Sequence, residues 1–287
     1  MSVARHGGGV GAAARALASQ IHPVFMLPPL AAAAFGAMFA RGAAFVPMAV
    51  HLGVVFCGLY TAHVKDGYVD FHRRGEDDDH PLTERGCRLA LAASTTGFGL
   101  GTAVIGALVG PVAALFCLPG WLLGFLHAPH LDTNPVTATV GYPAGIALAL
   151  LGGYYVQART LSVPVVAFAA LFFVILAGIK VVDDATDYDY DRTIDKRTVA
   201  VVLGPARARQ TAYGLMALGL AGVVVLTLAG VFPPSSVGSV AAFGVVAVFA
   251  RRAGADDELA TMLLVRASYL FLAVLVVAVW FQPLARP

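Results

Sequence analysis

The stretch "VPVVAFAALFFVILAGIKVVDDATDYDYDRTIDKR", from Val163 to Arg197, joins a long apolar run to a cluster of aspartates. A helix needs roughly 20 apolar residues to cross the hydrocarbon core of a bilayer, and residues 163–182 supply them. The aspartates follow where such a helix would leave the membrane. The stretch therefore predicts a membrane-spanning helix with a negatively charged end.

The composition extends this interpretation to the whole chain. Of 287 residues, 59% are hydrophobic and only 13% are charged, whereas a soluble domain carries about 25% charged residues. The mean hydropathy is +0.78. These values exclude an ordinary soluble protein, and the net charge of +2 says little about partners. The 3 cysteines form no CxxC pair, so neither a disulfide framework nor a zinc site is indicated.

Apolar runs of spanning length recur along the chain, and we expect an all-α integral membrane bundle of nine transmembrane helices. Residues 1–287 are predicted to form a single membrane domain, of which 1–17 are a flexible N-terminus. Gly110 and Pro111 separate two runs and predict a tight hairpin. The nine runs are residues 20–40, 44–64, 88–108, 110–127, 136–156, 163–182, 211–231, 236–250 and 261–281.

Charged residues gather on one side of this predicted topology. Most of the 19 Lys and Arg and all 17 Asp and Glu fall at the N-terminus or in and beside the gaps that follow the second, fourth, sixth and eighth runs. By the positive-inside rule this side is cytoplasmic. That rule does not require acidic residues there, so we expect the acidic clusters to have a function on the cytoplasmic side of the cell membrane.

Two acidic motifs have helical spacing. Asp183, Asp187 and Asp191 form a DxxxDxxxD series, which on one helix would place three carboxylates on one stripe. Asp66 and Asp70 are spaced in the same way at the end of the second run. Neighbouring carboxylates repel one another. A divalent cation would relieve that repulsion, and oxygen ligands suit Mg²⁺.

Basic residues accompany both motifs and could bind phosphate oxygens. For Lys180, an ion pair with Asp183 and Asp184 is an equally good interpretation. A Mg²⁺–diphosphate site at the mouth of an apolar cavity suits a diphosphate with a hydrocarbon tail, and a prenyl diphosphate is the obvious candidate. Phe71 and Tyr142 could line the cavity and contact an allylic cation. The candidate diphosphate-binding residues are Arg73, Arg74, Lys180, Lys196 and Arg197.

At these motifs the chain resembles the UbiA superfamily of intramembrane prenyltransferases. "DGYVDFHRRGED" from Asp66, "GGYYVQ" from Gly152 and "DYDRTIDKRTVAVVLG" from Asp189 are similar to its menaquinone-pathway, dihydroxynaphthoate-prenylating branch. The resemblance implies Mg²⁺-dependent transfer of a polyprenyl group to a lipophilic acceptor. It implies metal binding by both acidic motifs and diphosphate contacts by Arg74 and Lys196.

The first motif departs from the family pattern. Asp66 stands where the family usually has Asn, and Gly67 and Arg74 stand at positions that are usually acidic. His80 precedes Pro81 where an Arg-Pro pair is common. Whether these departures alter or abolish the usual activity is open at this point, and so are the acceptor, the prenyl chain length and the oligomeric state.

Other functions remain possible from the sequence. On the same fold, the acceptor could be a glycerol-phosphate lipid, a haem or a carotenoid end, the last as in a lycopene-elongase-like enzyme. A cation-coupled carrier is the alternative from another class, although carriers usually hold their charges near the bilayer midplane. A catalytically silent pseudoenzyme is a further alternative. The expected partners are a prenyl diphosphate, its acceptor and membrane lipid, with no nucleic acid.

Overall fold

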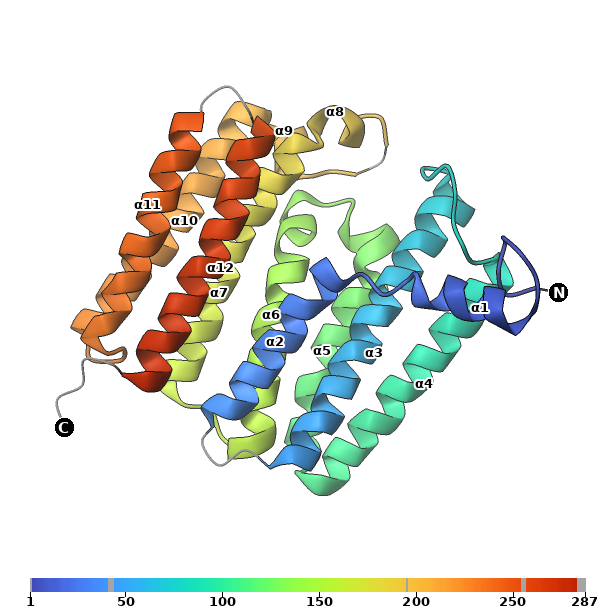
Figure 1. Ribbon diagram of the computed structural model, residues 1–287, viewed down its shortest axis with the longest axis horizontal. Helices are drawn as coiled ribbons and strands as arrows, with labels where there is room; N and C mark the ends of the chain where they lie inside the picture. The colour runs from blue at the N-terminus through green and yellow to red at the C-terminus, as the bar shows by residue number, and fades with distance from the viewer. Residues whose placement is uncertain (1, 41–43, 195, 254–256, 283–287) are drawn as a thin grey trace. The chain divides into compact units, whose positions relative to one another are not determined.

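The computed structural model describes residues 2–40, 44–194, 196–253 and 257–282, and within these ranges the chain is helical without strands (Figure 1). Asp195 and Asp256 lie outside the described residues. The described chain forms two compact units, one comprising residues 1–133 and 144–161 and the other residues 134–143 and 162–287. The prediction of a single domain stays a prediction.

Each predicted apolar run coincides with a helix. Within the described residues, seven helices are long and apolar enough to cross a membrane, and α1 with α2 forms a bent pair, with an angle of 63°, that could be an eighth span. The apolar helix at Pro234–Ala250 is shorter. A multi-pass all-α fold is therefore confirmed, but the number nine is not.

The first unit is built around α3 (Phe45–Val69), which contacts α2, α4 and α5. Gly110 has a φ of 133°, which favours glycine, and lets the chain reverse between α4 and α5 within two residues. The predicted tight hairpin is therefore confirmed. The other helices here are α1 (Gly9–Ala18), α2 (Pro23–Phe39), η1 (Asp70–Arg74), α4 (Glu84–Leu108), α5 (Pro111–Leu126), η2 (His127–Leu131) and most of α6 (Pro135–Ala158).

Glycines bring α2 and α6 into backbone contact. A Cβ atom at Gly36 would collide with the carbonyl oxygen of Leu150, and one at Gly153 would collide with the carbonyl oxygen of Ala33. The alanines beside this contact are buried, with Ala33 0% exposed. Small residues commonly allow such close packing between membrane helices.

We expect Gly153→Ala to destabilise the protein by about 1–3 kcal/mol, because the added methyl group must push two backbones apart. The matched control is Gly145→Ala on the same helix, where a Cβ meets no atom within 4 Å. That control should gain about 0.5–1 kcal/mol from helix propensity. Thermal unfolding in detergent measures the stability of both variants. Equal shifts of Tm in Gly153→Ala and Gly145→Ala would contradict the close-packing argument.

The N-terminus differs from the flexible segment that the sequence predicted. Residues 9–18 form α1, and Ala12 and Ala16 are buried in a cluster with Val64 and Leu82. Before it, the amide of Arg5 donates to the carbonyl of Pro81 at 2.9 Å. The prediction overlooked that small alanines at helical spacing make an apolar face that can pack.

The second unit has α7 (Val163–Thr186) at its centre, in contact with α10, α12 and α9. Buried aromatic and branched side chains cover much of α7, including Phe168 and Ile175, both 0% exposed. Its apolar part is the most extensively buried of the candidate spans, at 67%. Its other helices are α8 (Tyr188–Asp191), α9 (Val199–Leu203), α10 (Pro205–Leu228), η3 (Pro234–Ser236), α11 (Val237–Ala253), α12 (Asp257–Phe281) and the start of α6.

Candidate functional site

The first acidic motif lies where α3 passes into the π-helical turn η1. Asp66 is in the last turn of α3, and the amide of Asp70 donates to the carbonyl of Asp66. The two carboxylates therefore project from successive turns, as the spacing predicted. Gly75, with a φ of 66°, ends the turn, and its amide N–H donates a hydrogen bond to the carbonyl of Asp70. π-Helical turns occur often at functional sites.

Arg74 joins this motif to the loop after α5. Its guanidinium donates to both carboxylate oxygens of Asp132, at 2.6 and 3.2 Å. It also lies 3.6 Å from Asp70 and 3.9 Å from Glu76. The side chains of Arg74 and Asp132 are only 14% and 5% exposed. Arg74 is thus mainly committed to Asp132, and its predicted role in binding diphosphate stays a prediction.

The neighbouring predicted residues have other surroundings. Phe71 stacks on the His80 ring at 6.0 Å and lies under the Arg5 guanidinium at 4.3 Å. Arg73 is exposed, and its Nε donates to the Tyr68 hydroxyl at 3.1 Å. Arg73 therefore offers an accessible positive charge beside the motif. Phe71 is packed between charged and aromatic neighbours, and its predicted place in a substrate cavity stays untested.

The second motif does not lie on one continuous helix, which corrects the predicted stripe. Asp183 is in α7, Asp187 marks the break with φ −92° and ψ 9°, and Asp191 ends the short α8. Even so, the Asp191 amide donates to the Asp187 carbonyl at 2.8 Å, so helical spacing continues across the break. The physical reason is that polar, mutually repelling side chains favour a local turn over a longer helix.

The side chains of this motif have unequal exposure. Asp187 is exposed, Asp183 is about half-exposed, and Asp191 is 5% exposed. Burial raises the pKa of the Asp191 carboxyl above its usual range, and the positive charge of Lys196 partly opposes that effect. The motif therefore has an accessible edge at Asp187 and a buried edge at Asp191.

Lys180 forms the ion pair that was one of the two interpretations of its position. Its Nζ lies 2.5 Å from Asp184 and 3.3 Å from Asp183. A contact of Lys180 with diphosphate stays a prediction. Of the other predicted residues, Arg197 is exposed, while Lys196 and Tyr142 (on α6) are half-buried.

Asp132 and Asp184 lie beside the two motifs but were not among the site residues predicted from the sequence. Both are nearly buried and each is paired with a basic residue, Asp132 with Arg74 and Asp184 with Lys180. The second pair has a sequence signal, because the two residues are four apart on one helix. The first has none, because Arg74 and Asp132 are brought together only by the packing of η2 against α3 and α5.

The donors of the two motifs fit Mg²⁺. They are carboxylate oxygens at the ends of apolar helices, and hard oxygen ligands are what Mg²⁺ prefers. Within each unit, successive carboxylates are one helical turn apart along the backbone. Asp66 and Asp70 could therefore bind Mg²⁺ in the first unit, and Asp183, Asp187 and Asp191 could bind Mg²⁺ in the second.

Comparison with known proteins agrees with this arrangement. The sequence model of the UbiA prenyltransferase family matches residues 30–275. The 1,4-dihydroxy-2-naphthoate octaprenyltransferase of Mycobacterium tuberculosis (strain ATCC 25618 / H37Rv) is 32% identical over 248 residues, which cover 81% of each chain.

Solved structures share the fold. A digeranylgeranylglyceryl phosphate synthase superposes with a TM-score of 0.73 at 12% identity, covering 93% of this chain and 97% of the other. A UbiA homologue from Archaeoglobus fulgidus, bound to GPP and Mg²⁺, has a TM-score of 0.67 at 16% identity, covering 94% and 99%.

The fold and the acidic motifs thus define an intramembrane prenyltransferase, in agreement with these matches. The chain belongs to the UbiA prenyltransferase family. Family membership decides against the cation-coupled carrier that the sequence had left as an alternative.

Proposed function

We propose that this enzyme catalyses Mg²⁺-dependent transfer of a polyprenyl group from its diphosphate to 1,4-dihydroxy-2-naphthoate. The observation that carries the proposal is the pair of carboxylate motifs at the ends of apolar helices α3 and α7, in a chain 32% identical to a naphthoate octaprenyltransferase. Support for the metal comes from the relative that binds GPP and Mg²⁺.

The roles of the residues follow from their chemistry. Asp66 and Asp70 in the first unit, and Asp183, Asp187 and Asp191 in the second, would each bind Mg²⁺ through their carboxylate oxygens. When bound, Mg²⁺ supplies positive charge that stabilises the departing diphosphate. Arg73 and Arg197 are exposed and contribute further positive charge to the phosphate oxygens.

The buried ion pairs organise the carboxylates. Lys180 offsets part of the negative charge of Asp183 and Asp184, so that the acidic end of α7 is less strongly self-repelling. Arg74 does the same for Asp70 while Asp132 anchors its guanidinium. Each motif thus keeps some carboxylates paired with basic residues within the protein and others available to a cation.

The test is an assay of the purified enzyme in lipid nanodiscs with geranylgeranyl and longer prenyl diphosphates and dihydroxynaphthoate. We expect diphosphate and prenylated naphthoate to form in equal amounts with Mg²⁺, to fall to background with EDTA, and to return when Mg²⁺ is restored. Transfer that persists in EDTA would contradict the metal requirement. If diphosphate is released only when a glycerol-phosphate lipid is added and not with the naphthoate, the proposed acceptor is wrong and the lipid takes its place.

The charged ends of α3 and α7 face the cytoplasm in this proposal, because positive residues accompany both acidic motifs. A cysteine placed at the exposed position Asp189 tests the orientation, with Cys57, Cys87 and Cys117 as the background thiols. A membrane-impermeant maleimide should label it in inside-out vesicles and not in intact cells. The reverse pattern would overturn the orientation.

A further inference from the structure

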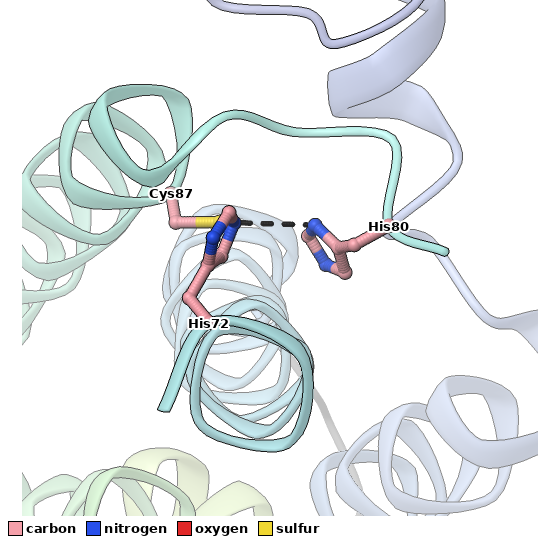
Figure 2. Close-up of side chains that lie close together, drawn as sticks. All are labelled: His72, His80 and Cys87. Atoms are coloured by element: carbon pink, nitrogen blue, oxygen red, sulfur yellow. Dashed lines mark hydrogen bonds between the residues drawn. The ribbon is translucent and has the colours of Figure 1, made fainter. Parts of the chain in front are cut away.

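A second group of potential metal ligands lies beside the first motif and differs from it in chemistry. His72 on η1, His80 in the following loop and Cys87 in the first turn of α4 each offer one ligand atom, and these atoms lie within 4.8 Å of one another. Figure 2 shows the three side chains converging from these three segments. Nδ1 of His80 and Sγ of Cys87 are 3.9 Å apart.

We propose that His72, His80 and Cys87 form a Zn²⁺ site that ties η1, the loop and α4 together. Two imidazole nitrogens and a thiolate are typical zinc ligands, with Zn–N and Zn–S bonds of about 2.0 and 2.3 Å. In a tetrahedron these bonds place N and S roughly 3.5 Å apart. The three ligand atoms, which lie within 4.8 Å of one another, therefore need to move only slightly closer together to bind one ion. Oxygen-preferring Mg²⁺ does not suit this set.

The surroundings hold the ligands in a water-poor setting. Cys87 is 0% exposed and His80 is 5% exposed, whereas His72 is half-buried. The Nε2 of His72 lies 3.1 Å from the carbonyl of Leu82. A ligating imidazole commonly donates its other N–H to a backbone carbonyl, which fixes the ring orientation. That contact leaves Nδ1 of His72 as its ligand atom.

Gly67 makes room for the second imidazole. A Cβ at this position would lie 2.5 Å from Nε2 of His80, so a side chain there would displace the ring. Two departures of the sequence from the family pattern, Gly67 and His80, thus depend on each other in space. Nδ1 of His80 now accepts a hydrogen bond from the Leu82 amide at 3.2 Å, and coordination would replace that bond.

Zinc binding would need no reaction partner. The Cys87 thiol would lose its proton to solvent as the S–Zn bond forms, and both histidines would bind as neutral imidazoles. Three protein ligands leave a fourth position for water. The effect on the protein would be a clamp on the loop between η1 and α4. This inference does not depend on the proposed acceptor or on Mg²⁺.

The experiment measures zinc, without an activity assay. The full-length protein is stripped with a strong chelator, passed through a desalting column and titrated with Zn²⁺ against a chromophoric competitor in excess Mg²⁺. We expect one zinc per chain. Cys87→Ser and His80→Gln should each lower the affinity at least about 100-fold, because each removes a ligand.

A matched control comes from Cys117, which is also buried and lies 3.9 Å from Nδ1 of a histidine, His51. It belongs to no three-ligand group within the described residues. Cys117→Ser should therefore leave zinc affinity unchanged. Gly67→Ala removes no ligand but displaces His80, so it should weaken binding at least about tenfold.

Co²⁺ provides a readout that does not require stable variants. Co²⁺ bound to the wild-type protein should give a thiolate-to-cobalt charge-transfer band. The absence of that band, unchanged zinc affinity in Cys87→Ser, or equal losses in Cys87→Ser and Cys117→Ser would each overturn the proposal.

Discussion

Asp187→Asn is expected to lower the rate of Mg²⁺-dependent diphosphate release at least about 100-fold, as losses of single charge-stabilising groups in active sites do. Asp187 is exposed at the break between α7 and α8, and its backbone carbonyl, which Asn retains, accepts the hydrogen bond from Asp191. The substitution therefore removes one negative charge with little effect on the fold. The measurement is diphosphate release in nanodiscs across a range of Mg²⁺ concentrations.

Asp189→Asn is the matched control for this prediction. Asp189 is exposed on the same short helix α8 and carries the same charge, but it is outside the series with four-residue spacing. It should keep most of the activity. Equal losses in the two variants would mean that the net charge of this segment matters and the position of the carboxylate does not. Full activity in Asp187→Asn would exclude it as a metal ligand.

Asp132→Ala is expected to destabilise the first unit by about 3 kcal/mol, the lower end of the cost of leaving a buried charge without its main partner. The cost is at the lower end because the Arg74 guanidinium still has two negatively charged neighbours, Asp70 at 3.6 Å and Glu76 at 3.9 Å. The free energy of unfolding in detergent measures the loss. Combining Asp132→Ala with Arg74→Met should restore most of it, because the double variant buries no unpaired charge.

The same variant has a second expected effect, on the metal. With Asp132 removed, the Arg74 guanidinium should pair more closely with Asp70 and compete with a cation there. We therefore expect Asp132→Ala to require more Mg²⁺ than the wild-type enzyme for half-maximal diphosphate release. Asp132→Asn keeps an oxygen acceptor for Arg74, so it should require less Mg²⁺ than Asp132→Ala. An unchanged Mg²⁺ requirement in Asp132→Ala would contradict this coupling while leaving the stability prediction intact.

Local sequence determined the helices and their charged ends. Runs of apolar residues long enough to cross a bilayer must form helices there, because only a helix satisfies its own backbone hydrogen bonds in lipid. The aspartates at four-residue spacing predicted the acidic motifs, and their chemistry predicted Mg²⁺. For the same reason the i,i+4 pair of Lys180 and Asp184 was within reach of the sequence.

Tertiary packing decided what depends on residues distant in sequence. The Arg74–Asp132 pair, the contact of Arg5 with the Pro81 carbonyl and the gathering of His72, His80 and Cys87 all require segments whose proximity no spacing rule gives. The sequence likewise could not show that Gly67 makes room for the His80 ring. Spacing along one helix fixes which side chains share a face, whereas contacts between segments depend on how complete surfaces pack.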